Sequence, residues 1–369
     1  MAWLYVGFVA FIVGLLALDL GVLHRKAQVI GVRAALGWSA LWIGLGLAFS
    51  GLIYLGYEHQ WLGLGTTADR TSTATVGPGG EILYNDGGSA LVKYLTGFLV
   101  EKSLAVDNIF VIAMIFGAFA VPPVYQHRVL FWGIVGALVM RGAMIAVGAA
   151  LITRFTWIIY VFGGFLILTG IKMLVLGGGT GDVRDNAVVR LARRLLPVTE
   201  RFHGSRFFVR AGSPASHAPA VDGGPVEPDR VVDLARAGTL LATPLLLALI
   251  LVEFTDLIFA VDSIPAIFAI TTDPFLVFTS NVFAILGLRS LYFALAGMID
   301  RFQYLKVALA FVLVVVGVKM MNHGWLKAWL GTAFNFYVLG VVGGIIAAGV
   351  LASLVIPRRP SSAPELPIR

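Results

Sequence analysis

Acidic side chains recur inside two long apolar stretches of the sequence, where a chain that crosses a membrane tolerates few charges. Both stretches read acid, five residues, Asp and then a small polar residue; the members are Glu101, Asp107 and Asn108 in the first, and Asp256, Asp262 and Ser263 in the second. An ionisable residue at membrane depth costs at least about 2.5 kcal/mol, so it marks a functional site. Carboxylate, amide and hydroxyl oxygens are ligands for hard cations, so the chemistry predicted here is binding of Mn²⁺, Ca²⁺ or Mg²⁺.

The composition places these acids in a membrane protein. Of 369 residues, 59% are hydrophobic and 13% are charged, whereas a soluble domain has about 25% charged residues. The absence of cysteine excludes disulfides and thiolate metal sites, and six histidines leave oxygen as the main ligand type. The net charge of +7 is explained by basic residues in cytoplasmic loops, so no nucleic-acid partner is expected.

Apolar runs of about 20 residues, the length that a helix needs to span a bilayer, recur along the chain. They predict an all-α fold, a polytopic membrane helix bundle with about nine transmembrane helices. The predicted segments are 2–23, 36–56, 90–118, 129–152, 156–176, 241–270, 276–298, 303–321 and 334–356. The first segment is predicted to be a retained helix and not a signal peptide, because no basic region precedes it.

Lys and Arg gather in every second loop, which predicts an external N-terminus and a cytoplasmic C-terminus. Most of them lie in 177–240, where 188–196 has apolar residues at helical spacing with arginines between them. We expect an amphipathic helix on the inner leaflet there, and a flexible loop over 211–228. The predicted parts are N-terminal helices with an outer loop, a first three-helix unit, a basic cytoplasmic loop, a second three-helix unit, and a last helix with a disordered tail: 1–89, 90–176, 177–240, 241–321 and 322–369.

The two three-helix units match each other in sequence. Residues 105–108 align with 260–263, Arg141 aligns with Arg289, and 170–173 align with 317–320. Because three is an odd number of helices, the second unit must enter the membrane upside down. Inverted repeats of this kind are common in secondary transporters, which place their substrate site near the membrane midplane where the repeats meet.

Helix geometry puts several of these side chains on common faces. Residues seven apart share a face, which pairs Glu101 with Asn108 and Asp256 with Ser263. Glu253 stands three residues before Asp256 and joins its face. Pro265 follows shortly after and cannot donate a backbone hydrogen bond, so we expect a kink that frees carbonyls for a cation.

Basic and amide residues near the acids have more than one interpretation. Arg141 and Arg289 either pair with the acids when no cation is bound, or extend to the membrane interface. Asn281 is expected to cap or line the site. Lys172 and Lys319 end their helices and are expected to extend to the interface.

The acidic stretches resemble the TerC family of integral membrane proteins, which is named for tellurite resistance. The resemblance is carried by 97–108, 253–270 and 279–289, and extends from about residue 5 to 325. It implies a multi-pass protein of the bacterial inner membrane that exports manganese and relieves metal stress. Carried over by position, the motif acids are Glu101, Asp107, Glu253, Asp256 and Asp262.

The residues and the resemblance together predict a membrane exporter of divalent cations, with Mn²⁺ as the transported ion implied by the resemblance. Coupling to protons is compatible with so many carboxylates, because some must hold protons when no cation is bound. The alternative, which the resemblance to plant members of the family implies, is a membrane scaffold or insertion factor that partners other membrane proteins. Such a protein would act through the basic cytoplasmic loop 177–240. Handling of tellurium oxyanions ranks last, because an acid-lined site repels anions. Without a nucleophile–base pair, an enzyme is not expected. The oligomeric state does not follow from the sequence.

Overall fold

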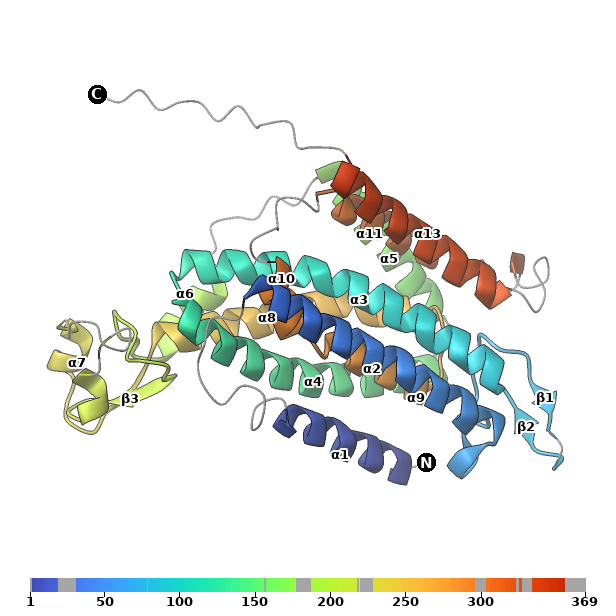
Figure 1. The fold of residues 1–369 in the computed structure, drawn as a ribbon, viewed down its shortest axis with the longest axis horizontal. Helices are drawn as coiled ribbons and strands as arrows, with labels where there is room; N and C mark the ends of the chain where they lie inside the picture. Colours follow the sequence, from blue (N-terminus) through green and yellow to red (C-terminus); the bar gives the residue numbers. More distant parts are fainter. Residues whose placement is uncertain are drawn as a thin grey trace.

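The computed structural model is a bundle of long helices, with a part built of short helices and strands at one end and a short pair of strands at the other (Figure 1). It describes residues 2–18, 31–77, 79–155, 157–176, 187–217, 219, 228–295, 303–322, 325–326 and 334–355. Within these ranges the side chains of some helical residues, including Asp107 and Asp262, lie outside the described part.

Helices make up most of the described chain, and its four strands form two separate antiparallel pairs. The long helices are α1 (Ala2–Leu18), α2 (Val32–Glu58), α3 (Gly87–Ala118), α4 (Pro123–Arg154), α5 (Ile158–Leu176), α8 (Pro244–Phe268), α9 (Pro274–Ile285), α11 (Gln303–Met321) and α13 (Phe334–Val355). The short elements are η2 (Trp61–Gly63), β1 (Thr75–Val76), β2 (Ile82–Leu83), α6 (Ala187–Leu195), β3 (Phe208–Arg210), η4 (Pro214–His217), α7 (Arg230–Leu234), β4 (Leu240–Ala242) and α10 (Leu288–Leu295). β1 pairs with β2, and β3 pairs with β4.

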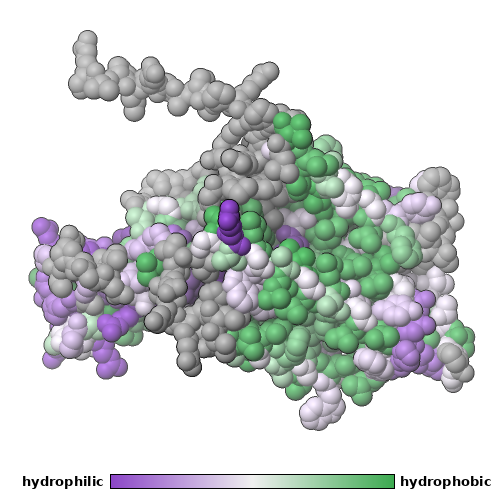
Figure 2. Space-filling model, in the orientation of Figure 1, coloured by the Kyte–Doolittle hydropathy of each residue, from purple (hydrophilic) through white to green (hydrophobic). Residues whose placement is uncertain are grey.

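Six helices of the described chain are long and apolar enough to cross a membrane, counting α9 and α10 as one. α3, which carries four charged residues, is not among the six, nor are α1 and α11, whose described apolar parts are shorter. Figure 2 shows hydrophobic residues over the middle of the visible face and hydrophilic residues toward its two ends. The chain is therefore a mostly helical, multi-pass membrane protein, whereas nine crossings remain a prediction.

Residue types at the helix starts explain where several helices begin. Asp86 caps α3 by accepting a hydrogen bond from the backbone N–H of Ser89 at 2.7 Å. Asp273 caps α9 by accepting one from the N–H of Phe275 at 3.0 Å. Proline stands in the first turn of α4, α8 and α9, where a missing N–H removes no helical hydrogen bond.

The helix that the sequence predicts over 276–298 is interrupted in the structure. α9 ends at Ile285 and α10 begins at Leu288. Gly287, between them, has a φ of 80°, and a Cβ added there would lie 2.6 Å from the Cβ of Trp42 on α2. Both the positive φ and the close approach require glycine. The predicted apolar range therefore holds two helices, and the close approach that constrains Gly287 comes from a residue that is distant in sequence.

Pro265 does not interrupt its helix. α8 continues through Pro265 and ends at Phe268. A helix break lies between α9 and α10, whereas the kink expected at Pro265 remains a prediction.

Small residues let α5 and α11 pack closely. A Cβ added to Gly163 would lie 3.2 Å from the carbonyl oxygen of Gly317, and one added to Gly170 would lie 2.7 Å from that of Ala310. Because the earlier residue of α5 meets the later residue of α11, the two helices run antiparallel. Together with α13 they form a layer beside the main bundle (Figure 1).

Residues 187–217 and 228–243 fold at one end of the bundle, opposite the β1–β2 hairpin (Figure 1). Arg128 of α4 holds it there, because Nη1 donates to Ser205 at 3.0 Å and the guanidinium lies 5.2 Å from the Phe207 ring centre. α6 buries Val189 and exposes Leu195. Its apolar spacing agrees with the predicted amphipathic helix, while its position on the membrane remains a prediction.

Candidate cation site

Three helices bring two acids and one base together inside the bundle. Glu101 lies on α3, Arg141 on α4 and Asp256 on α8. Arg141 donates from Nε to Asp256 Oδ2 at 3.1 Å and from Nη2 to Oδ1 at 2.9 Å, and its Nη1 forms an ion pair with Glu101. Their exposed fractions are 0% for Glu101, 3% for Arg141 and 9% for Asp256. In this structure Arg141 therefore pairs with the acids and does not extend to an interface.

The two predicted neutral ligands belong to the same cluster. Asn108 donates from Nδ2 to Asp256 Oδ1 at 2.9 Å. Arg141 Nη1 lies 3.4 Å from the hydroxyl oxygen of Ser263. Both Asn108 and Ser263 are buried. The pairs predicted to share a helix face, one on α3 and one on α8, thus meet in one cluster, and the guanidinium of α4 lies between them.

Among the described side chains of this cluster, two carboxyl groups, those of Glu101 and Asp256, contact one guanidinium, that of Arg141. Glu101 Oε2 is buried and has no hydrogen-bond partner among the described residues. A buried carboxylate oxygen without a donor is costly, and it is also an available cation ligand.

A small cavity reaches two of these residues. Its volume is about 20 Å³, and its polar lining comes from Asn108, Thr255 and Asp256. Leu288, the first residue of α10, is part of its apolar lining. A cavity of this size holds about one water molecule, so the structure leaves room for a small ligand beside Asp256.

Glu253 lies near this cluster but has a different contact. A Cβ added to Gly136 on α4 would overlap its carboxylate, so that carboxylate lies against the α4 backbone. Its Oε2 is buried without a hydrogen-bond partner among the described residues. Glu253 is thus an acid with a free oxygen, and it does not share Arg141.

The remaining predicted site residues lie on the expected helices. Asp107 is on α3 and Asp262 on α8, and their side chains are outside the described part. Asn281 is fully buried on α9, and neither its Oδ1 nor its Nδ2 has a partner within the described chain. Arg289 is buried on α10. Among the described side chains, no three acids or histidines are close enough together to hold a metal ion.

A buried polar cluster at the β1–β2 end was not predicted from the sequence. Lys93 of α3 donates to Asp69 Oδ2 at 2.9 Å and to Asn85 Oδ1 at 2.7 Å. Asp69 also accepts hydrogen bonds from Thr271 Oγ1 at 2.5 Å and from Thr272 N at 3.1 Å. The cluster ties the loop after α2 to the turn between α8 and α9. The one sequence signal for this cluster is Lys93, a lysine inside an apolar run.

Two aspartates at this end have shifted pKa values of opposite sign. Burial alone raises the pKa of Asp69, but the Lys93 ammonium and the hydrogen bonds from Thr271 and Thr272 outweigh it and lower that pKa well below its usual range. Burial and the Asp69 charge raise the pKa of Asp273 to about 6, although a hydrogen bond from Tyr57 at 2.8 Å opposes the shift.

Two lysines also differ from expectation. Lys319 is only 4% exposed, so the prediction that it extends to the interface was wrong. Lys102, next to Glu101, was given no role, yet it donates to the carbonyl oxygens of Ala284 and Leu286 at 3.0 and 3.2 Å. These carbonyls belong to the end of α9, so Lys102 contacts the helix break.

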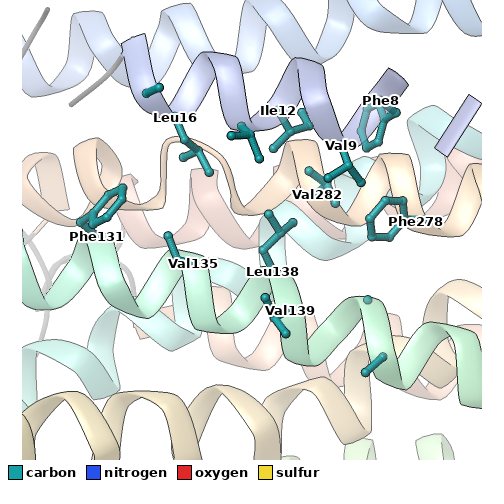
Figure 3. Close-up of a pocket in the computed structure, with 14 residues that line it drawn as sticks. Phe8, Val9, Ile12, Leu16, Phe131, Val135, Leu138, Val139, Phe278 and Val282 are labelled. Carbon is teal, nitrogen blue, oxygen red and sulfur yellow. The ribbon is translucent and has the colours of Figure 1, made fainter. Parts of the chain in front are cut away.

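A second cavity, of about 530 Å³, lies between α1, α4 and α9 (Figure 3). The labelled side chains around it are apolar: Phe8, Val9, Ile12, Leu16, Phe131, Val135, Leu138, Val139, Phe278 and Val282. It is much larger than the cavity beside Asp256, but it offers no charged or hydrogen-bonding side chain to a cation. We therefore place the candidate site at the polar cluster.

Comparisons with known proteins also indicate a membrane protein. A protein of Myxococcus xanthus, "Uncharacterized membrane protein STKORF319", is 44% identical over 365 residues, which cover 99% of this chain and 96% of that protein. Proteins named "Putative membrane-bound redox modulator Alx" are 42% identical in Salmonella typhi, over 92% of each chain, and 41% identical in Escherichia coli strain K12, over 91% of this chain and 92% of that one. No solved structure matches. The family model described as "Integral membrane protein TerC family" matches residues 86–361, a range that contains the whole cluster, and the chain therefore belongs to the TerC family of integral membrane proteins.

Proposed function

We propose that this protein exports divalent cations, most of all Mn²⁺, through the cluster formed by Glu101, Arg141 and Asp256. The observation that carries the proposal is the arrangement of the described side chains: two buried carboxyl groups share one guanidinium, and Glu101 Oε2 has no hydrogen-bond partner among the described residues. A low-dielectric site with net negative charge favours a further cation or proton. The choice of manganese among hard cations rests on the family resemblance.

Arg141 acts in this proposal as the internal counter-ion of the empty state. A divalent cation would neutralise both carboxylates by itself, so Arg141 would leave when the cation enters. The oxygens of Glu101, Asp256, Asn108 and Ser263 then become ligands, which suits Mn²⁺, Ca²⁺ and Mg²⁺ better than thiophilic metals. Asp107, Glu253, Asp262 and Asn281 are the further candidates.

The proposed pathway lies between inverted repeats of three helices, in 90–176 and 241–321. In the repeat alignment α3 corresponds to α8, and α4 corresponds to α9. A symmetric pair of repeats should therefore contain both an α3–α9 contact and an α4–α8 contact, and both contacts exist. A Cβ on Gly97 of α3 would lie 3.0 Å from Ser280 Oγ of α9, and one on Gly133 of α4 would lie 3.3 Å from Val252 of α8. In the repeat alignment Gly97 matches Val252, and Gly133 matches the neighbour of Ser280.

The α5–α11 contact supports the same symmetry. In the alignment Gly163 matches Ala310, and Gly170 matches Gly317. The contacts are Gly163 with Gly317 and Gly170 with Ala310. Replacing each residue of one contact by its match in the other repeat gives the other contact, as a two-fold axis between the repeats requires. The basic loops place the N-terminus outside the bacterial inner membrane and the C-terminus in the cytoplasm in this proposal. Export of the cation is coupled to entry of protons.

The direct test is flux of Mn²⁺ through the purified protein in proteoliposomes, followed with a fluorescent indicator. We expect Asp256→Asn and Glu101→Gln to reduce flux at least about tenfold, which corresponds to roughly 1.4 kcal/mol. Asp233→Asn, at an exposed position on α7, is the matched control and should transport normally. Unchanged flux in the double variant of Glu101 and Asp256 would refute the proposal. Competition of Ca²⁺ and Mg²⁺ with the Mn²⁺ flux identifies the preferred ion. The dependence of the flux on an imposed pH gradient identifies coupling to protons.

The scaffold alternative is favoured by one observation at the cytoplasmic loop. Leu195 of α6 and Leu234 of α7 are 71% and 87% exposed beside arginines, as expected of a surface that meets a membrane or a partner. If the loop carries the function, replacing Leu195 and Leu234 with serine should abolish activity in cells, while the variants of Glu101 and Asp256 stay active. The name of the relatives from Salmonella typhi and Escherichia coli suggests a redox effect, but a chain without cysteine has no thiol to exchange.

A further inference from the structure

The break between α9 and α10 removes the helical donors of several carbonyl groups. The N–H of Leu286 still bonds to Val282, and the N–H of Leu291 bonds to Gly287. The last carbonyls of α9 therefore need other donors. Ala284 and Leu286 are 0% and 2% exposed. Because irregular backbone at membrane depth is tolerated only where its polar groups are satisfied, something must bind these carbonyls.

The Lys102 ammonium meets this need. Its Nζ lies 3.0 Å from the carbonyl oxygen of Ala284 and 3.2 Å from that of Leu286. The C-terminal end of a helix has a partial negative charge, which favours a cation at this position. No described carboxylate lies within ion-pair distance of Lys102. Two neutral oxygens at a helix end suit a cation of single charge, whereas a divalent ion requires carboxylates.

The break also sets one wall of the cavity at the candidate site. Leu288 follows Gly287 directly and lines the cavity beside Asn108 and Asp256. On the other side of the break, Trp42 of α2 packs against Gly287. Any shift of the carbonyls at the end of α9 would therefore move Leu288 relative to Asp256. The same turn of α3 that supplies Lys102 supplies Glu101, which binds Arg141.

We infer that the α9–α10 break is a binding site for a small monovalent cation, which the Lys102 ammonium fills as a tethered occupant, and that this occupancy holds Leu288 over the cavity at Asp256. Lys102 is a positioning residue, because it acts on the cavity through the break. The claim that the break binds a cation does not depend on the proposed function, whereas the claimed effect on transport rests on it.

The test replaces the tethered cation with a free one. Lys102→Ala leaves two carbonyl oxygens around an open space. We expect the purified variant in detergent to melt at least about 5 °C below the original protein in choline chloride. Ammonium or methylammonium chloride at equal ionic strength should restore much of the loss, because these ions fit the space and choline does not. The original protein should show no difference between these salts.

A variant pair covers the case in which Lys102→Ala does not fold. Lys102→Arg keeps a cation that can reach both carbonyls, and Lys102→Met keeps the length without a donor. We expect the Arg variant to melt near the original protein and the Met variant well below it. Equal melting temperatures of the two, or equal stability of Lys102→Ala in choline and in ammonium salts, would overturn the inference.

Transport separates this inference from the proposed function. In proteoliposomes, Lys102→Met should change the KM for Mn²⁺ by at least about threefold while the Arg variant stays within about twofold, because Leu288 shifts at the site. Failure of the original protein to transport any divalent cation would refute the function but not the melting result. Transport by the original protein with an unchanged KM in Lys102→Met would refute the link to Leu288.

Discussion

Arg141 and Asp256 meet in a two-point contact, Nε to Oδ2 at 3.1 Å and Nη2 to Oδ1 at 2.9 Å, while the remaining nitrogen of Arg141 faces Glu101. Two parallel hydrogen bonds fix the orientation of a guanidinium as well as its distance. A lysine would supply the charge but not the planar fork. The pair therefore makes Arg141 a specific occupant of the space between two acids.

Removing the Arg141 charge should destabilise the protein. Arg141→Gln leaves two buried carboxylates without their cation, which costs about 3–5 kcal/mol. We expect a lower melting temperature in detergent, and partial restoration by millimolar Mn²⁺ because a divalent ion replaces the lost charge. Arg154→Gln, at an exposed position at the end of the same helix, should change little. Equal losses in the two variants would contradict this prediction.

Gly136 should be required because Glu253 lies against it. In Gly136→Ala the new methyl group overlaps the Glu253 carboxylate, and overpacking of this kind costs about 1–3 kcal/mol. In a Glu253→Ala background the same substitution should be nearly neutral. Gly117→Ala on α3, where nothing lies within 4 Å of the added Cβ, is the control. Thermal unfolding of the four proteins of this cycle measures the coupling, and additive losses would show that the contact is absent.

Asp273 should make stability depend on pH between about pH 4 and pH 6. Burial and the Asp69 charge raise its pKa from the ordinary 3.8 to about 6. In that window the folded protein binds more protons than the unfolded chain, so stability falls as pH rises, by up to about 3 kcal/mol in all. Asp273→Asn can still cap α9 and should remove this part of the pH dependence. Melting curves across the window test it, and identical pH profiles would contradict it.

Asp69 should matter through its buried ion pair with Lys93. Asp69→Asn leaves a lysine that is 1% exposed without its counter-charge, at a cost of about 3–5 kcal/mol. Combining it with Lys93→Met should recover part of the loss, because no buried charge then remains unpaired. The comparison is the exposed substitution Asp233→Asn. If the double variant is less stable than Asp69→Asn alone, the ion pair is not the cause.

Much of the helical architecture could be predicted from the sequence. A helix lies in each of the nine predicted ranges, because hydrophobic runs and capping residues act locally. Glu101, Asn108, Asp256 and Ser263 are predicted site residues because polar residues in apolar helices are costly, and they meet in the structure. The cost of a charge is a property of its type and its segment, so the pattern needs no tertiary information.

Other features depend on contacts between distant parts of the chain. The helix breaks at Gly287, whose positive φ and close approach to Trp42 both require glycine, whereas Pro265, the stronger local signal, leaves α8 continuous. Lys93 and Lys102 gained partners in a loop and in a helix end that no local pattern connects to them.

By itself, therefore, the sequence determined that this is a multi-pass helical protein of the TerC type with acids at membrane depth. Only the tertiary structure decided that a guanidinium occupies the space between Glu101 and Asp256, that Glu253 faces Gly136 instead, and that Lys102 binds the end of α9. The physical reason is that burial cost belongs to a residue and its segment, whereas the group that offsets it comes from whichever helix packs alongside.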